Sequence, residues 1–465
     1  MMPERLFSTY QVANLLGATP GAVAQWVKNG WLTFHASPDG PPRISRGSLI
    51  QFLRQRGADV ARIFPEAAVE SPSPEAAPVE SRPTAEFFAA IPAAMPDQIV
   101  DAILADAIRC GAQAFHLTPR REGLALQLRL GGLLHDKVNF ARRLPRGLEP
   151  KLLAHLMALA GVDPGTPMPK SADFGRFVEG REVRLHLSAV PTIHGPRIVI
   201  HLQQPSAAQG LLQLGMDEAD RQRIEQILSG GGMVVVAAPR RPGPCGMLRA
   251  LLAAADTAAR SVVAVEKTAG LEVQGAARMR IDPGAGMTYA VALEALNDQD
   301  VDVILVGKLR DPLTATAALE AAHDGALVLA GMNVPGAPAA VGELFAMGLE
   351  PWPLAAAMPA VIEQAALRML CEHCKKPAEQ GDDHPVCTAT GCDHCAHTGY
   401  RGEIHLAAVL YVKGEVADAV RRAAPADQIA QAAERAGMKS LRQLALKEIR
   451  RGLSSPEELA RVLRR

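Results

Sequence analysis

The sequence predicts a multidomain protein in which a small N-terminal helical unit precedes an α+β domain, an α/β core and a metal-binding insertion. Three observations predict this fold class. A length of 465 residues suits two to four domains. Apolar strands alternate with Ala-rich helices over residues 212–360, which is typical of an α/β fold. Two C-x-x-C pairs with 17 residues between them follow that stretch and indicate a zinc site.

Composition and charge favour a cytoplasmic protein with reduced cysteines. Basic and acidic residues number 49 each, so overall charge does not attract the chain to nucleic acid or membrane. The sequence has no apolar run of 18 residues and no signal peptide, so we expect no direct membrane insertion. Four of the seven cysteines lie in C-x-x-C pairs, which favours a metal over a disulfide framework.

Residues 1–62 predict a compact unit of three short helices and a small hairpin. Gly17 and Gly30 suit the ends of the first two helices, and a Pro-Asp-Gly turn at 38–40 predicts the hairpin. The expected helices span residues 9–16, 20–29 and 45–56. The motifs V-A-x-L-L-G, W-V-K-x-G and R-I-S-R-x-x-L in this unit resemble the excisionase-like winged helix-turn-helix of the MerR superfamily.

This resemblance implies that the second helix enters the major groove of DNA. Residues 1–62 carry seven Lys/Arg against three Asp/Glu, so the unit is locally basic. Docking to a protein partner is an equal alternative, because the expected recognition helix is poor in arginine. The DNA-binding candidates are Gln25, Lys28, Asn29, Arg43 and Arg46.

Residues 63–95 form a predicted linker. Its central part, residues 65–86, contains five Pro, five Glu and one Arg. This composition predicts an acidic, extended tether.

From about residue 96 onward, motif order and spacing resemble the secretion-superfamily ATPases, the motors of type II secretion and type IV pilus assembly. The motifs are GLALQLRLGGLLHD (123–136), DFGR (173–176), SAVPTIHG (188–195), DVILVGKLRD (302–311), the two C-x-x-C segments and AGMKSLR (436–442). The resemblance implies an α+β ATPase-associated domain over 96–207 and a RecA-like, P-loop-type core over 208–370. A zinc insertion over 371–402 and a helical C-terminal region over 403–465 follow. It also implies a ring-like oligomer.

The segment where a P-loop is expected lacks the residues that a P-loop uses. A P-loop needs a Lys for the β- and γ-phosphates and a Ser/Thr hydroxyl for Mg²⁺. A strand over 233–237 and a helix over 248–255 flank the loop, but the two key positions are Pro244 and Cys245. Pro242 also has no N–H to give to a phosphate.

Three further motifs depart from the family pattern. Lys308 stands where the family has the Glu that activates water, and Asn333 stands at its histidine position. Glu266 is retained, but Lys267 and Gly270 replace the acids that follow it. Arg176 is retained, whereas His186 and His201 occupy two positions that are usually basic. The degenerate nucleotide site comprises Pro239, Arg240, Arg241, Gly243, Pro244, Cys245, Glu266, Lys308 and Asn333.

The paired cysteines predict a structural zinc. Cys371, Cys374, Cys392 and Cys395 have the spacing of a tetrahedral four-thiolate site. Because such a shell is closed, it leaves no open position for catalysis. We expect the nearby His373, His384, His394 and Cys387 to be bystanders.

The main hypothesis from the sequence is a pseudo-ATPase: no catalytic residue, no ATP hydrolysis, and neither ATP nor Mg²⁺ as a cofactor. Weak nucleotide binding through Arg240, Arg241 and Arg249 is an alternative. The chain would be an oligomeric binding or regulatory subunit, self-associating or joining an active ATPase beside an inner-membrane secretion or pilus machine. One rival is a DNA-binding transcriptional regulator that oligomerises through the ATPase body. The other is a functioning secretion or pilus motor ATPase with altered motifs.

Overall fold

The computed structural model describes most of the chain from residue 96 onward. It describes residues 96–463 except 137–147, 164, 166–168, 204–208, 240–242, 256, 258, 268–274, 378–385 and 396, and before residue 96 only 6–7, 12, 23, 34–37, 40–45 and 49. The chain divides into two units, which are described separately. One comprises Met1–Thr84 with Phe177–Glu182, and the other comprises Ala85–Arg176 with Val183–Arg465.

The described part of the N-terminal unit is a small antiparallel sheet. Strands β1 (Leu6–Phe7), β2 (Phe34–Ser37) and β3 (Gly40–Ser45) pair in the order β1-β3-β2. The hairpin expected about residues 38–40 is therefore present as β2 and β3. Four apolar side chains of this unit are fully buried, namely Val12, Val23, Ile44 and Leu49. Most residues of the expected helices, Gln25, Lys28, Asn29 and Arg46 among them, lie outside the described residues.

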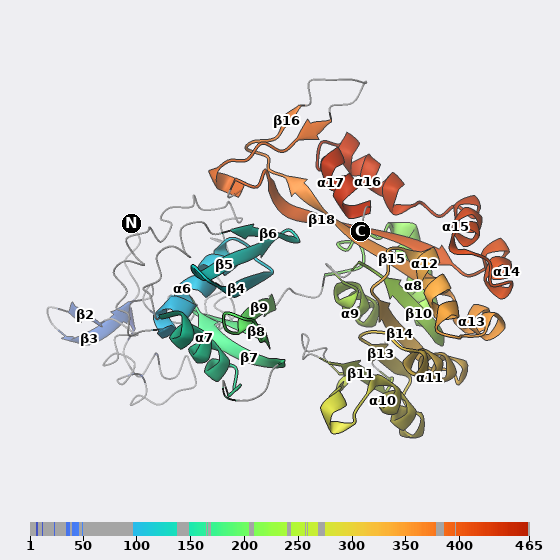
Figure 1. The fold of residues 1–465 in the computed structure, drawn as a ribbon, viewed down its shortest axis with the longest axis horizontal. Coiled ribbons are helices and arrows are strands. Elements are labelled where there is room, and N and C mark those ends of the chain that lie inside the picture. Colours follow the sequence, from blue (N-terminus) through green and yellow to red (C-terminus); the bar gives the residue numbers. More distant parts are fainter. Residues whose placement is uncertain are drawn as a thin grey trace. The chain divides into compact units, whose positions relative to one another are not determined.

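The α+β domain is a six-stranded sheet with two helices (Figure 1). Helix α6 (Pro96–Arg109) buries Ile99, Val100, Ile103 and Leu104, a spacing of one helical face. It contacts α7 (Leu148–Leu159). The sheet order β6-β5-β4-β9-β8-β7 comes from β4 (Ala114–Arg120), β5 (Gly123–Leu130), β6 (Leu133–Asp136), β7 (Lys170–Val178), β8 (Arg181–Val190) and β9 (Arg197–Gln203).

The α/β core confirms the expected class. Its seven-stranded sheet has the order β12-β11-β13-β14-β10-β15-β18, parallel except for the β15–β18 pair. The strands are β10 (Gly232–Ala237), β11 (Val262–Glu266), β12 (Ala277–Arg280), β13 (Val303–Val306), β14 (Leu327–Met332), β15 (Ala360–Leu370) and β18 (Tyr400–Tyr411). The helices are α8 (Glu218–Leu228), α9 (Cys245–Ala254), α10 (Tyr289–Leu296), α11 (Pro312–His323), α12 (Ala337–Ala346) and α13 (Pro351–Ala357).

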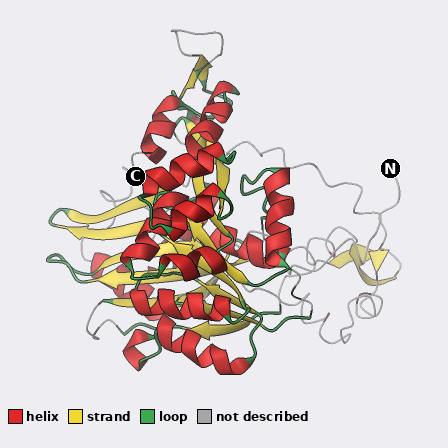
Figure 2. Ribbon diagram, turned by 90° about the vertical axis from the view of Figure 1, so that its right-hand side faces the viewer, coloured by secondary structure: helices red, strands yellow, loops and turns green. Residues whose placement is uncertain are grey.

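Strand β10 shows why this sheet is buried on both faces. Met233, Val235 and Ala237 belong to one apolar cluster, whereas Val234 and Val236 belong to another. Successive side chains of a strand point to opposite faces, so an uninterrupted apolar run packs into two layers. Figure 2 shows helices on the sheet of this core. The carboxyl ends of the parallel strands share one edge, where ligands bind in open α/β sheets.

The C-terminal region differs from the prediction in one respect. The segment over 403–465 was expected to be mostly helical, but it starts inside β18, which pairs with β15 from Ala360↔Tyr411 to Leu370↔Tyr400. The cysteine-rich insertion is therefore the long connection of an antiparallel pair. It contains β16 (Lys376–Pro377) and β17 (Cys387–Thr388). Helices α14 (Glu415–Arg421), α15 (Ala426–Arg435), α16 (Leu441–Arg450) and α17 (Pro456–Leu463) follow.

Candidate functional site

The sheet brings several of the predicted nucleotide-site residues to its carboxyl edge. Glu266 ends β11, and Gly307 and Lys308 follow β13. A Cβ atom on Gly307 would lie 3.8 Å from Glu266 Cγ and 3.4 Å from Tyr289 Oη, so these elements meet closely. Asn333 follows β14, and the loop that ends at Pro244 follows β10. Arg240 and Arg241 lie outside the described residues.

The described residues at the two ends of the loop after β10 contact the rest of the protein. Gly243 takes the left-handed conformation (φ 83°), and its N–H donates to the Pro239 carbonyl at 3.1 Å. Pro244 is the N-cap of α9 and offers no side-chain cap. Its ring packs against Gly331 of β14, where an added Cβ would come within 2.7 Å of the proline Cγ. The position that the family gives to a phosphate-binding Lys is thus a buried packing residue.

Charge at this edge is altered as well. Glu266 forms an ion pair with Arg278 of β12, with 3.3 Å between Oε2 and the guanidinium nitrogen. Cys245 lies near enough to Arg249, Glu266 and Lys308 for all three charges to act on its thiol. Although Cys245 is exposed to solvent, desolvation by the surrounding protein raises the pKa of its thiol, and the two cations act to lower it. Sequence reasoning missed Arg278 and Tyr289, because neither lies in a nucleotide motif.

These residues do not fit Mg²⁺–ATP in the P-loop manner. A P-loop holds Mg²⁺ with a hydroxyl and an acid at the end of a neighbouring strand. Here a thiol replaces the hydroxyl, and Glu266 is paired with Arg278. Asp311 instead caps α11, accepting from Thr314 N at 2.9 Å and from Thr314 Oγ1 at 2.8 Å. We therefore derive no hydrolytic step from this loop.

A polar cavity of about 670 Å³ adjoins the site. Its lining includes His116, Arg129, Arg197 and His201 from the six-stranded sheet and Pro239 and Asn333 from the core. The rings of His186 and His201 are 6.1 Å apart, and His186 Nδ1 lies 2.7 Å from Asp173 Oδ1. The histidines at the two usually basic positions therefore lie together on one face of the sheet.

Arg176, the arginine retained in the DFGR segment, makes its contacts within this chain to helix α6. Its guanidinium bonds to Asp101 and, at 2.8 Å, to Asp97, both on α6. The hydrogen bond that Arg176 donates to Asp101 is the main reason that the pKa of Arg176 is raised. Within this chain, Arg176 therefore fixes β7 to α6.

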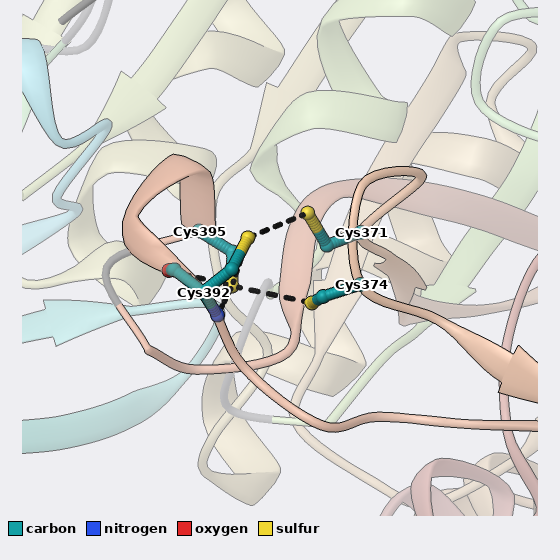
Figure 3. Close-up of side chains that lie close together, drawn as sticks. All are labelled: Cys371, Cys374, Cys392 and Cys395. Carbon is teal, nitrogen blue, oxygen red and sulfur yellow. Dashed lines mark hydrogen bonds between the residues drawn. The ribbon is translucent and has the colours of Figure 1, made fainter.

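The four predicted zinc ligands come together (Figure 3). The Sγ–Sγ distances are 3.8 Å for Cys371–Cys392, Cys374–Cys395 and Cys392–Cys395. Tetrahedral Zn²⁺ with bonds of about 2.3 Å places thiolates roughly 3.8 Å apart, so the cluster fits zinc.

Backbone N–H groups favour the thiolate form of one of these cysteines, Cys395. Those of Cys392 and Gly399 donate to Cys395 Sγ at 3.2 and 3.1 Å. Burial works to raise the pKa of Cys395, but these hydrogen bonds outweigh it and lower the value to about 7. A lowered pKa favours the thiolate form that binds metal. His373 and His394 stack on each other 3.9 Å apart outside the cluster, and His384 lies outside the described residues.

Comparison with known proteins decides the family. The family described as "Type II/IV secretion system protein" matches residues 92–461. The chain belongs to this family. The matched residues cover the α+β domain, the core, the cysteine-rich insertion and the C-terminal helices.

Several relatives match this chain over most of its length. The Type II secretion system protein HxcR of Pseudomonas aeruginosa is 31% identical over 370 residues, covering 79% of this chain and 77% of the relative. The Type II secretion system ATPase E of Vibrio cholerae is 28% identical, covering 78% and 75%. The Type IV pilus assembly ATPase PilB of Thermus thermophilus is 28% identical, covering 79% and 43%.

Solved structures show the same fold. The X-ray structure of the Legionella pneumophila ATPase DotB matches with a TM-score of 0.58 at 15% identity, covering 79% of this chain and 95% of that one. The pilus retraction motor PilT with bound ADP matches with a TM-score of 0.54 at 18% identity, covering 78% and 96%. The predicted RecA-like class of these secretion ATPases is therefore confirmed for the core.

These comparisons correct the main functional hypothesis. The hypothesis of a non-catalytic binding or regulatory subunit is wrong, because two relatives that are 28% identical over more than three quarters of the chain are named as a secretion ATPase and a pilus assembly ATPase. They favour the rival, a motor ATPase with altered motifs. The helix-turn-helix, its DNA contacts and the absence of ATP hydrolysis stay predictions. Among the described residues, no helix is long and apolar enough to cross a membrane.

Proposed function

We propose that this chain is a motor ATPase subunit of a type II secretion or type IV pilus-assembly machine, with altered nucleotide motifs. The observation that carries the proposal is the family match over residues 92–461. It spans every domain from the α+β sheet to the last helix, so the whole motor module is retained rather than one fragment of it.

Contacts between the α+β sheet and the C-terminal region support a motor. Gln113 donates to Glu403 of β18 at 2.9 Å, and its side-chain oxygen accepts from Gly132 N at 3.1 Å. A Cβ on Gly131 would lie 2.5 Å from Arg368 Cδ on β15. Through these contacts, a conformational change at the edge of the six-stranded sheet can reach strands β15 and β18 of the core.

Self-association in a ring is part of the proposal. The family relationship supports it. We place the assembled motor in the cytoplasm, at the inner-membrane secretion or pilus machine. Zinc is its structural metal.

The N-terminal unit adds a recognition function to this proposal. The β2–β3 hairpin and the locally basic residues 1–62 support binding of DNA, and docking to a protein of the machine is the alternative. In either case the acidic tether would allow each copy in a ring to reach its partner.

The test is ATP turnover by the purified, zinc-loaded full chain over a range of protein concentrations, together with rescue of secretion or pilus assembly in a strain that lacks the gene. The proposal expects turnover that rises with self-association, and rescue by the unmodified chain. A chain that assembles yet neither hydrolyses ATP nor rescues the strain would contradict it.

A further inference from the structure

The β5–β6 turn of the six-stranded sheet docks on four charged side chains of the core. This docking cluster comprises Arg368 of β15, Glu403 of β18, and Glu458 and Arg461 of α17. Gln113 joins the two sides, because it donates to Glu403 at 2.9 Å and accepts from Gly132 N at 3.1 Å. A Cβ on Gly131 would lie 2.5 Å from Arg368 Cδ, and one on Gly132 would lie 3.7 Å from an Arg461 guanidinium nitrogen. The turn therefore rests directly on both arginines.

Arg368 is held in place from the core side. Its Nε and Nη2 donate to Glu458 Oε2 at 2.9 and 2.8 Å, and its backbone N–H donates to Oε1 at 2.9 Å. The side chain of Glu458 is fully buried and also accepts from Arg461 at 2.7 Å. Moving Arg368 away would leave part of a buried charge network unpaired, which is strongly unfavourable. The turn thus docks on a side chain whose position β15 and α17 fix together.

The same arginine lies on Tyr400, which follows the cysteine cluster. Arg368 Cζ is 3.9 Å from the centroid of the Tyr400 ring, a cation–π contact. The residue before this tyrosine, Gly399, donates its N–H to Cys395 Sγ at 3.1 Å and accepts from Cys371 N at 3.0 Å. A continuous series of contacts therefore leads from the cysteine cluster through Tyr400 and Arg368 to the β5–β6 turn.

We propose that Tyr400 and Arg368 couple metal binding at the cysteine cluster to the docking of the β5–β6 turn, so that the α+β domain is held most firmly on the core when the four thiolates are ligated. Zinc bound by four thiolates fixes the spacing between Cys371, at the end of β15, and Cys395, shortly before β18. Such a coupling is reciprocal, so loss of docking must weaken metal binding by the same factor. The inference goes beyond the motor function and is independent of it, because no nucleotide takes part.

Hydrogen exchange of the full chain with and without zinc tests the docking. Gly132 is buried, so the amides of residues 131–136 should exchange slowly in the zinc-loaded chain. Removing zinc with a chelator in reducing buffer should speed their exchange at least about fivefold, since the exchange rate follows the opening equilibrium. The amides of β10, in the centre of the core, should not change. Unchanged exchange at residues 131–136, or an equal increase in β10, would overturn the inference.

Two glycine variants test the reverse direction. Gly131→Ala places a Cβ against Arg368, which cannot yield easily, so it should weaken zinc affinity at least about fivefold in competition with a chromophoric chelator. Gly111→Ala is the matched control. Its backbone is also left-handed (φ 66° against 52° for Gly131), but nothing lies within 4 Å of its Cβ, so it should bind zinc like the wild type. Equal zinc affinity of the two variants would contradict the coupling.

A third variant keeps the test decisive if Gly131→Ala fails to fold. Tyr400→Leu removes the ring on which Arg368 lies and leaves the four cysteines and the α+β domain unaltered. Zinc removal should then no longer change the exchange of residues 131–136. Exchange that still responds to zinc in Tyr400→Leu as it does in the wild type would overturn the inference.

Discussion

The ring of Pro244 lies against the backbone of Gly331, so closely that a Cβ atom on this glycine would be 2.7 Å from the proline Cγ. The contact joins the loop after β10 to the neighbouring strand β14. At the position where the family has a phosphate-binding lysine, this chain has a proline whose ring fills a space between two strands. The loop has therefore gained a packing role as it lost a phosphate-binding one.

Gly331→Ala should destabilise the core by about 1–3 kcal/mol, the usual cost of overpacking. The new Cβ would also lie 2.8 Å from the Gly307 carbonyl oxygen, which is backbone and cannot rotate away. Denaturant unfolding checks this. The control Gly342→Ala lies in α12 with nothing within 4 Å of its Cβ, and should gain about 0.5–1 kcal/mol. Equal unfolding midpoints for the two variants would contradict the packing role.

One zinc ion should bind per chain and stabilise the C-terminal part of the molecule. Thiolate coordination makes the free energy of metal binding part of the free energy of folding. Cys371→Ser should therefore lose most of the zinc and lower the melting temperature, while Cys110→Ser, outside the cluster, should do neither. Metal analysis of carefully reduced protein that finds no zinc would refute this.

Stability should fall in acid partly because of Glu458. Its side chain is fully buried and pairs with Arg368 at 2.8 Å and with Arg461. Burial works to raise the pKa of this carboxyl, but the hydrogen bonds from both arginines outweigh it and lower the pKa. A lowered folded-state pKa gives stability that is present above the unfolded value, near 4.3, and is lost as pH falls through the folded value.

Glu458→Gln should therefore lower the melting temperature at pH 7 and flatten its dependence on pH below about 4.5. Glu457→Gln, an exposed neighbour on α17, is the control and should keep the wild-type profile. A Glu458→Gln profile parallel to that of the wild type throughout this range would show that the buried pair does not respond to acid.

The N-terminal unit should bind DNA weakly and with a strong dependence on salt, because its net charge is small and its contacts would be to phosphates. Replacing Lys28, Arg43 or Arg46 with Ala should weaken binding and flatten the salt slope by about one each. The full chain should bind DNA with several sites better than the isolated chain segment 1–62 does, through avidity. Undetectable or salt-insensitive binding by both would leave protein docking as the role of this unit.

Local patterns predicted the elements that a short stretch of sequence specifies. Three features can each be recognised from a few neighbouring residues: the apolar run of β10, the hairpin turn at 38–40 and the two C-x-x-C pairs. Strand β18 escaped prediction because it pairs with β15 only across the cysteine-rich insertion. A strand that pairs across so long an insertion shows little hydrophobic periodicity of its own in the sequence, and helices follow it directly.

At the candidate site too, the sequence predicts local features and misses long-range contacts. Loss of the P-loop residues at Pro244 and Cys245 is visible in the sequence. The ion pair of Glu266 with Arg278 and the docking of Arg176 onto α6 are tertiary contacts. Their geometry, rather than residue type, decides which charges face the site. The same applies to function, since altered motifs alone favoured a non-catalytic subunit, and the family match over residues 92–461 together with the named ATPases overturned that hypothesis.

ATP turnover by the assembled full chain, compared with two matched variants, tests the central claim most directly. Glu266 is the acid retained at the site, whereas Glu320 is exposed on α11. The motor account predicts wild-type turnover that Glu266→Gln abolishes and Glu320→Gln preserves. Wild-type turnover no greater than that of Glu266→Gln, in protein that binds zinc and self-associates, would contradict the account and uphold the sequence-based prediction that this chain hydrolyses no ATP.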